Sequence, residues 1–486
     1  MDNKLLKGLK EESNYTLTEN RAVTYKSTFS GLLDLFAMGG ALRAADTSRI
    51  LQLFTKALSE DKELAIKLLF YLRDIREGQG ERRAFRIILK YLGDAYPDIV
   101  KKIIEHIPFY GRFDDIFELF NTNSSKALSK YIYKSLIDLE PNNIWYKWCP
   151  SINGSKKDIA RKIRDIFKLT NSQYRTWMSL QKGDLHLLET SMCMNEWNEI
   201  NYSNLPSYAM LKHTKAFRRH DNDRFQKYLN DLANKDRNMC ADIKINTETL
   251  YPYDIIRKVR NEGSSSVLEC DAMWNNQKDW TGGTEENILV VCDTSGSMYN
   301  DASNPMPLDI STSLAIYFAE RNKGVFHNHF ITFSSRPVLA SIKGGNILEK
   351  YENIKDSNWA SNTDLQAVFN LILETAKKNY IPEKDMPTKI IVITDMEFDD
   401  AGPNPNITVI KDKYEIAGYK LPTLVFWNVQ SRQNNVPITK DERGIILVSG
   451  SSASTFKALM GNIEEYSPID FLKSVLLTPR YERIKV

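Results

Sequence analysis

Apolar residues in the first half of the chain recur with the period of an α-helix. From about Arg43 they repeat at helical spacing as far as Leu72, which predicts two amphipathic helices. A third helix is expected at Glu81 to Leu92, after the break Glu77-Gly-Gln-Gly80, and Asp94-Ala-Tyr-Pro97 opens a fourth. Because short helices follow one another with brief turns and no strand pattern, we expect an α-solenoid of HEAT-like helix pairs that could close into a ring.

The second half has a different pattern. Ile288 to Cys292 is a continuous apolar run of strand length, which is typical of a strand buried on both faces of a parallel sheet. Further strands are expected at 325–333, 337–339, 389–394, 423–429 and 445–449, with helices alternating with most of them. This alternation predicts a doubly wound, Rossmann-like sheet, so the fold class is α followed by α/β.

Breaks in these patterns suggest the domain boundaries. The polar stretch Asn261-Glu-Gly-Ser-Ser-Ser266 and the turn Trp280-Thr-Gly-Gly283 mark a linker between the two halves. We expect an N-terminal arm at 1–30, a helical module at 31–260, a linker at 261–284, a sheet domain at 285–460, and a C-terminal helix and tail at 461–486 that packs back on the helical module.

Composition places the chain among globular proteins. It has 486 residues, of which 42% are hydrophobic and 26% charged, enough for a large core. The opening residues carry no apolar signal region, and no window approaches the roughly 18 apolar residues of a membrane span. We therefore expect a cytoplasmic monomer that does not bind membranes. The five cysteines lack C-x-x-C spacing, so neither a disulfide framework nor a zinc site is predicted.

Charge is unevenly distributed along the chain. Residues 1–280 hold 44 Lys and Arg against 37 Asp and Glu, a net +7, whereas residues 281–486 hold 21 against 25, a net −4. An anionic partner such as RNA would therefore favour the first half, and a cation the second.

Two basic clusters in the first half are candidate RNA-binding surfaces. Cations at helical spacing can share one helix face, and the first cluster is followed by Tyr174 and Trp177, on which bases could stack. The alternative is a solvated helix face with its aromatic residues in the core. The first cluster is Lys157, Arg161, Arg164 and Lys168, and the second is Lys212, Lys215, Arg218 and Arg219.

The first predicted strand of the sheet runs into a group of oxygen-bearing side chains. Asp293, Ser295 and Ser297 follow it directly, at the end of the strand where ligands bind in open α/β sheets. Mg²⁺ prefers such oxygen ligands in near-octahedral geometry. The alternative is a strand-to-helix turn whose hydroxyls cap the next helix.

Two later segments favour the metal interpretation. Thr363, in Ser361-Asn362-Thr363-Asp364, precedes an amphipathic helix, and Asp395 ends the strand expected at 389–394. This order of Asp-x-Ser-x-Ser, loop threonine and strand-ending aspartate resembles the metal-ion-dependent adhesion site of von Willebrand factor A domains, over about residues 281–486. The resemblance implies that Mg²⁺, or Mn²⁺, is held by Asp293, Ser295, Ser297, Thr363 and Asp395, with one position left for an acidic group of a protein partner.

The crevice is more acidic than this pattern requires. Glu397 and Asp399 follow Asp395 closely and could tighten cation binding or attract a basic partner. Equally, Glu397 could take the position of a partner's carboxylate, in which case the site would be structural.

Motifs in the helical half add a second resemblance. Leu72 to Arg82 and Ile107 to Asp115 are similar to motifs of the Ro ribonucleoprotein-like family, which joins a TROVE-type helical module to a von Willebrand A module. Trp148-Cys-Pro-Ser151, Tyr174-Arg175 and Leu205 to Met210 extend the similarity. The resemblance implies a helical ring that binds noncoding RNA, with single-stranded ends in its hole and structured RNA on a basic outer face.

These observations favour a noncatalytic RNA-binding protein. Phosphotransfer with Mg²⁺ on such a sheet would need a second carboxylate two residues after Asp293, and that residue is Ser295. The sequence also lacks a Walker loop and a nucleophile elbow. The alternative function is a metal-dependent protein-interaction scaffold that binds no nucleic acid.

Overall fold

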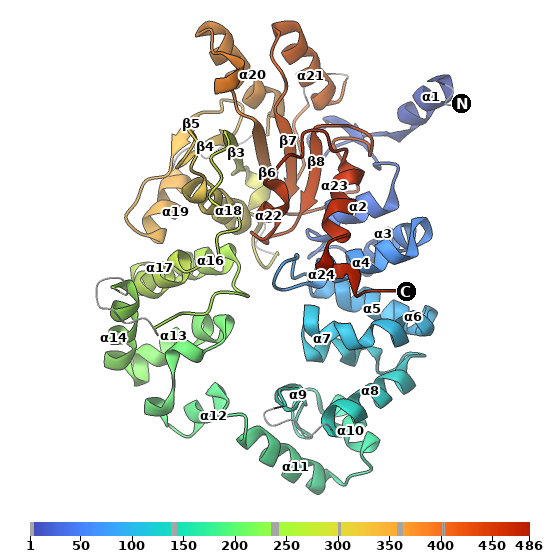
Figure 1. The fold of residues 1–486 in the computed structure, drawn as a ribbon, viewed down its shortest axis with the longest axis vertical. Coiled ribbons are helices and arrows are strands. Elements are labelled where there is room, and N and C mark those ends of the chain that lie inside the picture. The colour runs from blue at the N-terminus through green and yellow to red at the C-terminus, as the bar shows by residue number, and fades with distance from the viewer. Residues whose placement is uncertain are drawn as a thin grey trace.

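A helical region is followed by a mixed sheet domain, as the sequence predicts (Figure 1). The computed structural model describes residues 4–137, 143–234, 243–299, 303–356, 363–400, 402 and 404–486. Within these ranges no helix is both long and apolar enough to cross a bilayer.

The first part of the chain contains two short strands and many short helices. Its elements are α1 (Lys4–Asn14), β1 (Tyr15–Leu17), β2 (Val23–Tyr25), α2 (Gly31–Gly39), α3 (Thr47–Glu60), α4 (Lys62–Arg73), α5 (Arg83–Ala95), α6 (Pro97–Ile103), η1 (Ile104–His106), α7 (Ile107–Tyr110), η2 (Phe113–Leu119), α8 (Ser125–Ile137), α9 (Trp145–Trp148), α10 (Lys157–Ile166), α11 (Asn171–Gly183), α12 (Leu188–Cys193), η3 (Trp197–Glu199), η4 (Tyr202–Asn204), α13 (Ser207–His220), α14 (Asn222–Ala233), α16 (Pro252–Glu262), η5 (Gly263–Ser266) and α17 (Val267–Asn275).

Side-chain caps set the boundaries of the first helix pair. The Asp46 carboxylate accepts a hydrogen bond from the backbone N–H of Arg49 and begins α3. Asp61 ends α3 and begins α4, because its carboxylate accepts from the N–H of Leu64 at 2.9 Å. These two helices are the pair that the apolar pattern between Arg43 and Leu72 predicts.

The helices from α2 to α17 follow one another round an arc, which we call the helical arc (Figure 1). At one end α2 packs against β8, and at the other end α16 contacts α18 and α17 contacts α19. Both ends of the helical arc therefore rest on the sheet domain, which closes it.

The sheet domain has six strands in the order β5-β4-β3-β6-β7-β8. All neighbouring pairs are parallel except β4 and β5, which are antiparallel. The order reverses direction at β3, so the carboxyl ends of β3 and β6 form the crevice in which such sheets bind ligands. The domain comprises β3 (Ile288–Asp293), η6 (Gly296–Met298), α18 (Pro307–Arg321), β4 (His329–Phe333), β5 (Leu339–Ser341), α19 (Ile347–Asp356), α20 (Leu365–Lys378), η7 (Glu383–Asp385), β6 (Lys389–Thr394), α21 (Asn406–Ala417), β7 (Thr423–Asn428), β8 (Ile445–Ser449), α22 (Thr455–Leu459), α23 (Pro468–Leu476) and α24 (Pro479–Glu482).

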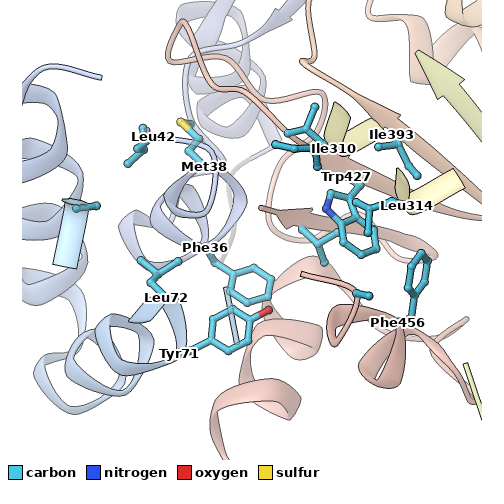
Figure 2. Close-up of a cluster of buried hydrophobic side chains, with 14 of the residues drawn as sticks. Phe36, Met38, Leu42, Tyr71, Leu72, Ile310, Leu314, Ile393, Trp427 and Phe456 are labelled. Atoms are coloured by element: carbon cyan, nitrogen blue, oxygen red, sulfur yellow. The ribbon is translucent and has the colours of Figure 1, made fainter. Parts of the chain in front are cut away.

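One hydrophobic core runs through both parts of the molecule (Figure 2). Phe36 of α2 stacks on Tyr71 of α4, with ring centroids 5.5 Å apart, and also contacts Phe471 of α23. In the sheet domain Trp427 of β7 packs against Phe456 of α22 at 4.8 Å. Because these side chains belong to one continuous buried cluster, the start of the helical arc is packed into the sheet domain.

Regions without a strong apolar pattern are more ordered than the sequence suggests. Residues 4–30, within the predicted arm, contain α1 and the hairpin of β1 and β2, in which Tyr15 pairs with Tyr25. Residues 263–275, within the predicted linker, form η5 and α17, whose Cys270 and Trp274 are buried. At the other end of the chain, Arg480 of α24 forms an ion pair with Asp74 beside α4.

Candidate metal centre and cationic surfaces

Two carboxylates lie at the carboxyl edge of neighbouring strands. Asp293 is the last residue of β3, and Asp395 directly follows β6. Because β3 and β6 are parallel neighbours, their carboxyl ends lie at the same edge of the sheet. Both side chains are buried, so their charges lack the screening that water would give.

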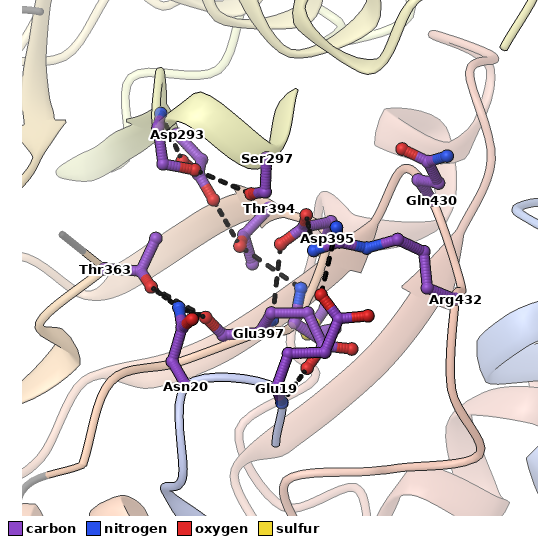
Figure 3. A network of polar contacts seen from close by, with 12 residues as sticks. Glu19, Asn20, Asp293, Ser297, Thr363, Thr394, Asp395, Glu397, Gln430 and Arg432 are labelled. Carbon is purple, nitrogen blue, oxygen red and sulfur yellow. Dashed lines mark hydrogen bonds and ion pairs between the residues drawn. The ribbon is translucent and has the colours of Figure 1, made fainter. Parts of the chain in front are cut away.

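Hydroxyl groups connect these carboxylates (Figure 3). One oxygen of Asp293 accepts from the Ser295 backbone N–H at 2.9 Å, and the other accepts from the Thr394 hydroxyl at 2.6 Å. The Ser295 and Ser297 hydroxyl oxygens are 3.0 Å apart, and the Ser297 hydroxyl also bonds the Asp395 carboxylate. Four of the five predicted ligands thus form one hydrogen-bonded group.

Thr363, the fifth predicted ligand, is held by different partners. Its hydroxyl donates to the Glu397 carbonyl at 2.7 Å and lies 3.2 Å from a carboxylate oxygen of Asp399. The Asn20 side-chain amide donates to the same hydroxyl at 3.3 Å. The neighbouring residues Ser361 and Asn362 lie outside the described part of the chain.

The two buried carboxylates of the crevice carry more negative charge than the nearby cation neutralises. Burial, together with the nearby charge of Asp395, raises the pKa of Asp293 to about 7. Burial also raises the pKa of Asp395, against the opposing effect of the Arg432 guanidinium. Two carboxylates held this close in a buried crevice favour a proton or a cation between them.

An arginine that the sequence analysis did not single out reaches this crevice. Arg432 follows β7 and donates to the Asp395 carboxylate at 2.8 Å, while its other terminal nitrogen pairs with Glu19 at 3.0 Å (Figure 3). Arg432 therefore partly neutralises Asp395 with a fixed positive charge. No local motif marks this contact, because Arg432 is far from Asp395 in the sequence.

The N-terminal arm covers the same edge of the sheet. The Thr18 hydroxyl donates to the Phe398 carbonyl at 2.6 Å, and the Asn20 side chain donates to the Glu397 carbonyl at 2.8 Å. The Glu397 carboxylate accepts from the Glu19 backbone N–H at 2.7 Å. Glu397, for which the sequence suggests a role in strengthening or completing the metal site, thus holds the N-terminal arm in place.

The crevice offers a divalent cation few charged ligands. No group of three or more His, Cys, Asp or Glu side chains suited to a metal is found in the described ranges. A cation here would therefore depend on the serine hydroxyls as well as on Asp293 and Asp395. These oxygens fit Mg²⁺, which accepts one or two carboxylates with neutral oxygens completing its shell.

The predicted basic stripe on α10 is largely exposed. Arg161 pairs with Asp158 at 3.2 Å, and Arg164 pairs with Asp165 at 2.5 Å. Lys157 begins α10, whereas Lys168 lies two residues beyond its end; both are exposed, and within the described part of the chain neither forms an ion pair. Half of this cluster is thus available to an anion.

In the second cluster, on α13, two of the four cations likewise have carboxylate partners and two do not. Arg218 pairs with Glu262 at 3.1 Å and with the buried Glu269 at 2.7 Å, so it ties α13 to α16 and α17. Lys215 is 3.5 Å from Glu262. Lys212 and Arg219 are exposed and form no ion pair with a described carboxylate. The clusters on α10 and α13 lie on opposite sides of the helical arc (Figure 1).

Comparison with known proteins gives relatives of unassigned activity and distant structural neighbours. Residues 287–471 match a family described as a domain of unknown function, DUF7788, and residues 18–105 and 150–288 match another, DUF2828. The chain is 28% identical over 518 residues to uncharacterized protein L728 of Acanthamoeba polyphaga mimivirus, covering 96% of this chain and 87% of that protein. Among solved structures, the Ro (RSR) protein of Deinococcus radiodurans is similar with a TM-score of 0.36 and 13% identity, over 89% of this chain and 99% of that one. Function must therefore be argued from the sites themselves.

Proposed function

We propose that this protein is a noncatalytic RNA-binding protein whose helical arc binds noncoding or single-stranded RNA. The observation that carries the proposal is the set of exposed cations on α13, on α10 and just after α10 that have no carboxylate partner among the described residues: Lys157, Lys168, Lys212 and Arg219. Exposed cations that are not neutralised within the protein can neutralise phosphates and release counterions.

Filter binding tests this function. The parent protein is titrated with a single-stranded RNA and a structured RNA at several salt concentrations. Binding through phosphates predicts an affinity that falls steeply as salt rises. If neither RNA binds at low salt, the RNA-binding function is wrong, and the metal-dependent interaction scaffold becomes the better account.

We further propose that the crevice binds Mg²⁺ or Mn²⁺. Asp293, Ser295, Ser297 and Asp395 would hold the ion, and Thr363 would approach it from its loop. When bound, the ion would supply the positive charge that the two carboxylates lack and would present a position for an acidic group. Support comes from the hydrogen-bonded group of hydroxyls and carboxylates and from the raised pKa of Asp293.

Calorimetry with Mg²⁺ and Mn²⁺ tests the metal site. Asp293→Ala removes a central carboxylate, so the binding heat seen with the parent should disappear. Asp385→Ala, in the short helix η7 of the same domain, is a control that should bind like the parent. Equal heats for the parent and Asp293→Ala would refute the site.

A further inference from the structure

Four cations converge on one carboxylate where α5, η2 and α10 meet. Asp114 of η2 lies 3.2 Å from Arg82, 3.0 Å from Arg86, 3.1 Å from Arg112 and 3.3 Å from Lys156. Asp114 is buried, with 4% of its side chain exposed. A single negative charge is therefore shared among four positive ones.

The neighbouring carboxylates do not balance these charges. Asp115 pairs with Arg86 at 2.7 Å and with Arg73 at 2.7 Å, and Glu118 lies 3.5 Å from Arg86. The ion pairs that link these groups join five cations, including Arg73, to three carboxylates, which leaves a surplus of two positive charges. Burial and the repulsion between neighbouring guanidinium groups lower the pKa of Arg82.

The surplus charge lies at the surface of the cluster. The side chains of Arg82, Arg112 and Lys156 are 43%, 35% and 48% exposed, whereas Arg73 and Arg86 are largely covered. The exposed three can thus reach a group in solution while Asp114 holds them together. We call Arg82, Arg112 and Lys156 the cation rim.

An aromatic surface lies beside the cation rim. The Arg112 guanidinium carbon is 4.1 Å from the ring centroid of Trp148, which is partly exposed at the end of α9. Trp145 of the same helix packs against Phe113 at 4.5 Å and fixes the helix on η2. An indole with a guanidinium group held over its ring offers a base a stacking surface next to cations that bind phosphate.

A purely structural role would account for only part of this arrangement. Arg73 and Arg86 with Asp115 suffice to join α4 and α5 to η2; Arg73 and Asp115 are buried, and only 17% of the Arg86 side chain is exposed. Lys156 adds a further half-exposed cation, from just before α10, to a carboxylate that already has three guanidinium neighbours. Adding like charges to a cluster costs free energy unless an anion is bound there.

We propose that the cation rim and Trp148 bind a phosphate of single-stranded RNA with an adjacent base stacked on the indole. This inference rests on the proposed function and adds to it a site distinct from the clusters on α10 and α13. The shared chemistry is a phosphate group, so a free phosphate is the alternative ligand that the test must separate.

The test compares variants of the full chain by fluorescence anisotropy with a labelled oligouridylate across a salt series. In Arg82→Gln/Lys156→Gln, Arg86 and Arg112 remain on Asp114, so the fold should persist, as thermal melting would verify. Because these two cations help to neutralise one phosphate, their removal should flatten the dependence of log K on log salt by roughly 0.7. Trp148→Leu should weaken binding on the order of tenfold with the salt slope unchanged.

Lys101→Gln is the matched control, because Lys101 is an exposed cation that pairs with Asp98 on α6, outside the cluster. It should bind oligouridylate like the parent. The inference is overturned if both cluster variants bind like the parent while neutralising Lys157 and Lys212 weakens binding, and the proposed function then survives. It is also overturned if inorganic phosphate or an oligoglutamate competes as well as oligouridylate. Absence of RNA binding by the parent would instead refute the proposed function.

Discussion

At the scale of single residues, the crevice combines a metal-type donor set with a competing charge from the protein itself. Asp293 and Asp395 are buried close together, and Arg432 supplies one positive charge to Asp395 at 2.8 Å. A divalent cation would have to bind next to this guanidinium or displace it. The position of Arg432 therefore affects how tightly the crevice can hold an ion.

Arg432→Gln should strengthen Mg²⁺ binding. Removing the guanidinium leaves Asp395 with its full negative charge, and a gain of roughly tenfold corresponds to about 1.4 kcal/mol. Calorimetry measures this, with Arg443→Gln as a control because Arg443 is exposed and pairs with Glu465. Unchanged or weaker affinity would mean that Arg432 supports the site instead of competing with the ion.

A second residue-scale prediction concerns Asp254, at the start of α16. Burial raises its pKa from 3.8 to about 6, although Arg257 pairs with it at 2.9 Å. Since the folded state binds this proton more tightly than the unfolded state, the contribution of Asp254 to stability is largest below pH 3.8 and is lost as pH rises through about 6.

Asp254→Asn should remove this loss. The stability of the variant relative to the parent should rise between pH 4 and pH 6 by on the order of 2 kcal/mol, and urea unfolding at both pH values measures it. A difference that does not change with pH would show that Asp254 stays ionised in the folded protein.

At the scale of elements, contacts between distant segments hold the helical arc together and cover the crevice. The hairpin of β1 and β2 is too small to be stable alone, but Tyr25 and Val436 exchange two backbone hydrogen bonds of 3.0 and 2.9 Å. At the far end of the arc, Arg218 joins α13 to Glu262 and Glu269. Such contacts give order to segments whose own sequence specifies little.

Replacing Arg218 should therefore affect folding more than RNA binding. Arg218→Met leaves the buried Glu269 without its cation and should cost on the order of 2 kcal/mol in the free energy of unfolding. Arg219→Met, one residue away and exposed, should change stability by no more than about 0.5 kcal/mol. Denaturant melts compare the two, and equal stabilities would contradict the structural role of Arg218.

At the scale of the whole molecule, the sequence predicts regular elements well and long-range contacts poorly. The continuous apolar runs at 389–394 and 445–449 correspond to β6 and β8, because strands buried on both faces need apolar residues throughout. The expected strand at 325–333 is shorter in the structure, where β4 begins at His329. The hairpin of β1 and β2 has no such pattern, since its partners are backbone atoms of the sheet domain.

In the candidate metal site, too, the sequence predicts the local contacts but not the long-range ones. The turn after β3 brings Asp293, Ser295 and Ser297 together by its own geometry, and the parallel pairing of β3 and β6 brings Asp395 to them. Sequence spacing can predict both. Glu19 and Arg432 come from segments placed by the tertiary fold, so no motif predicts them.

The central claim is that unpaired cations on the helical arc bind RNA phosphates. The most direct measurement is the salt dependence of RNA affinity for the parent and for a variant in which Lys157, Lys168, Lys212 and Arg219 are all replaced by Gln. The account predicts that the slope of log K against log salt for single-stranded RNA falls by roughly 0.7 for each phosphate that the variant no longer neutralises. An identical slope and affinity in the parent and the variant would contradict it.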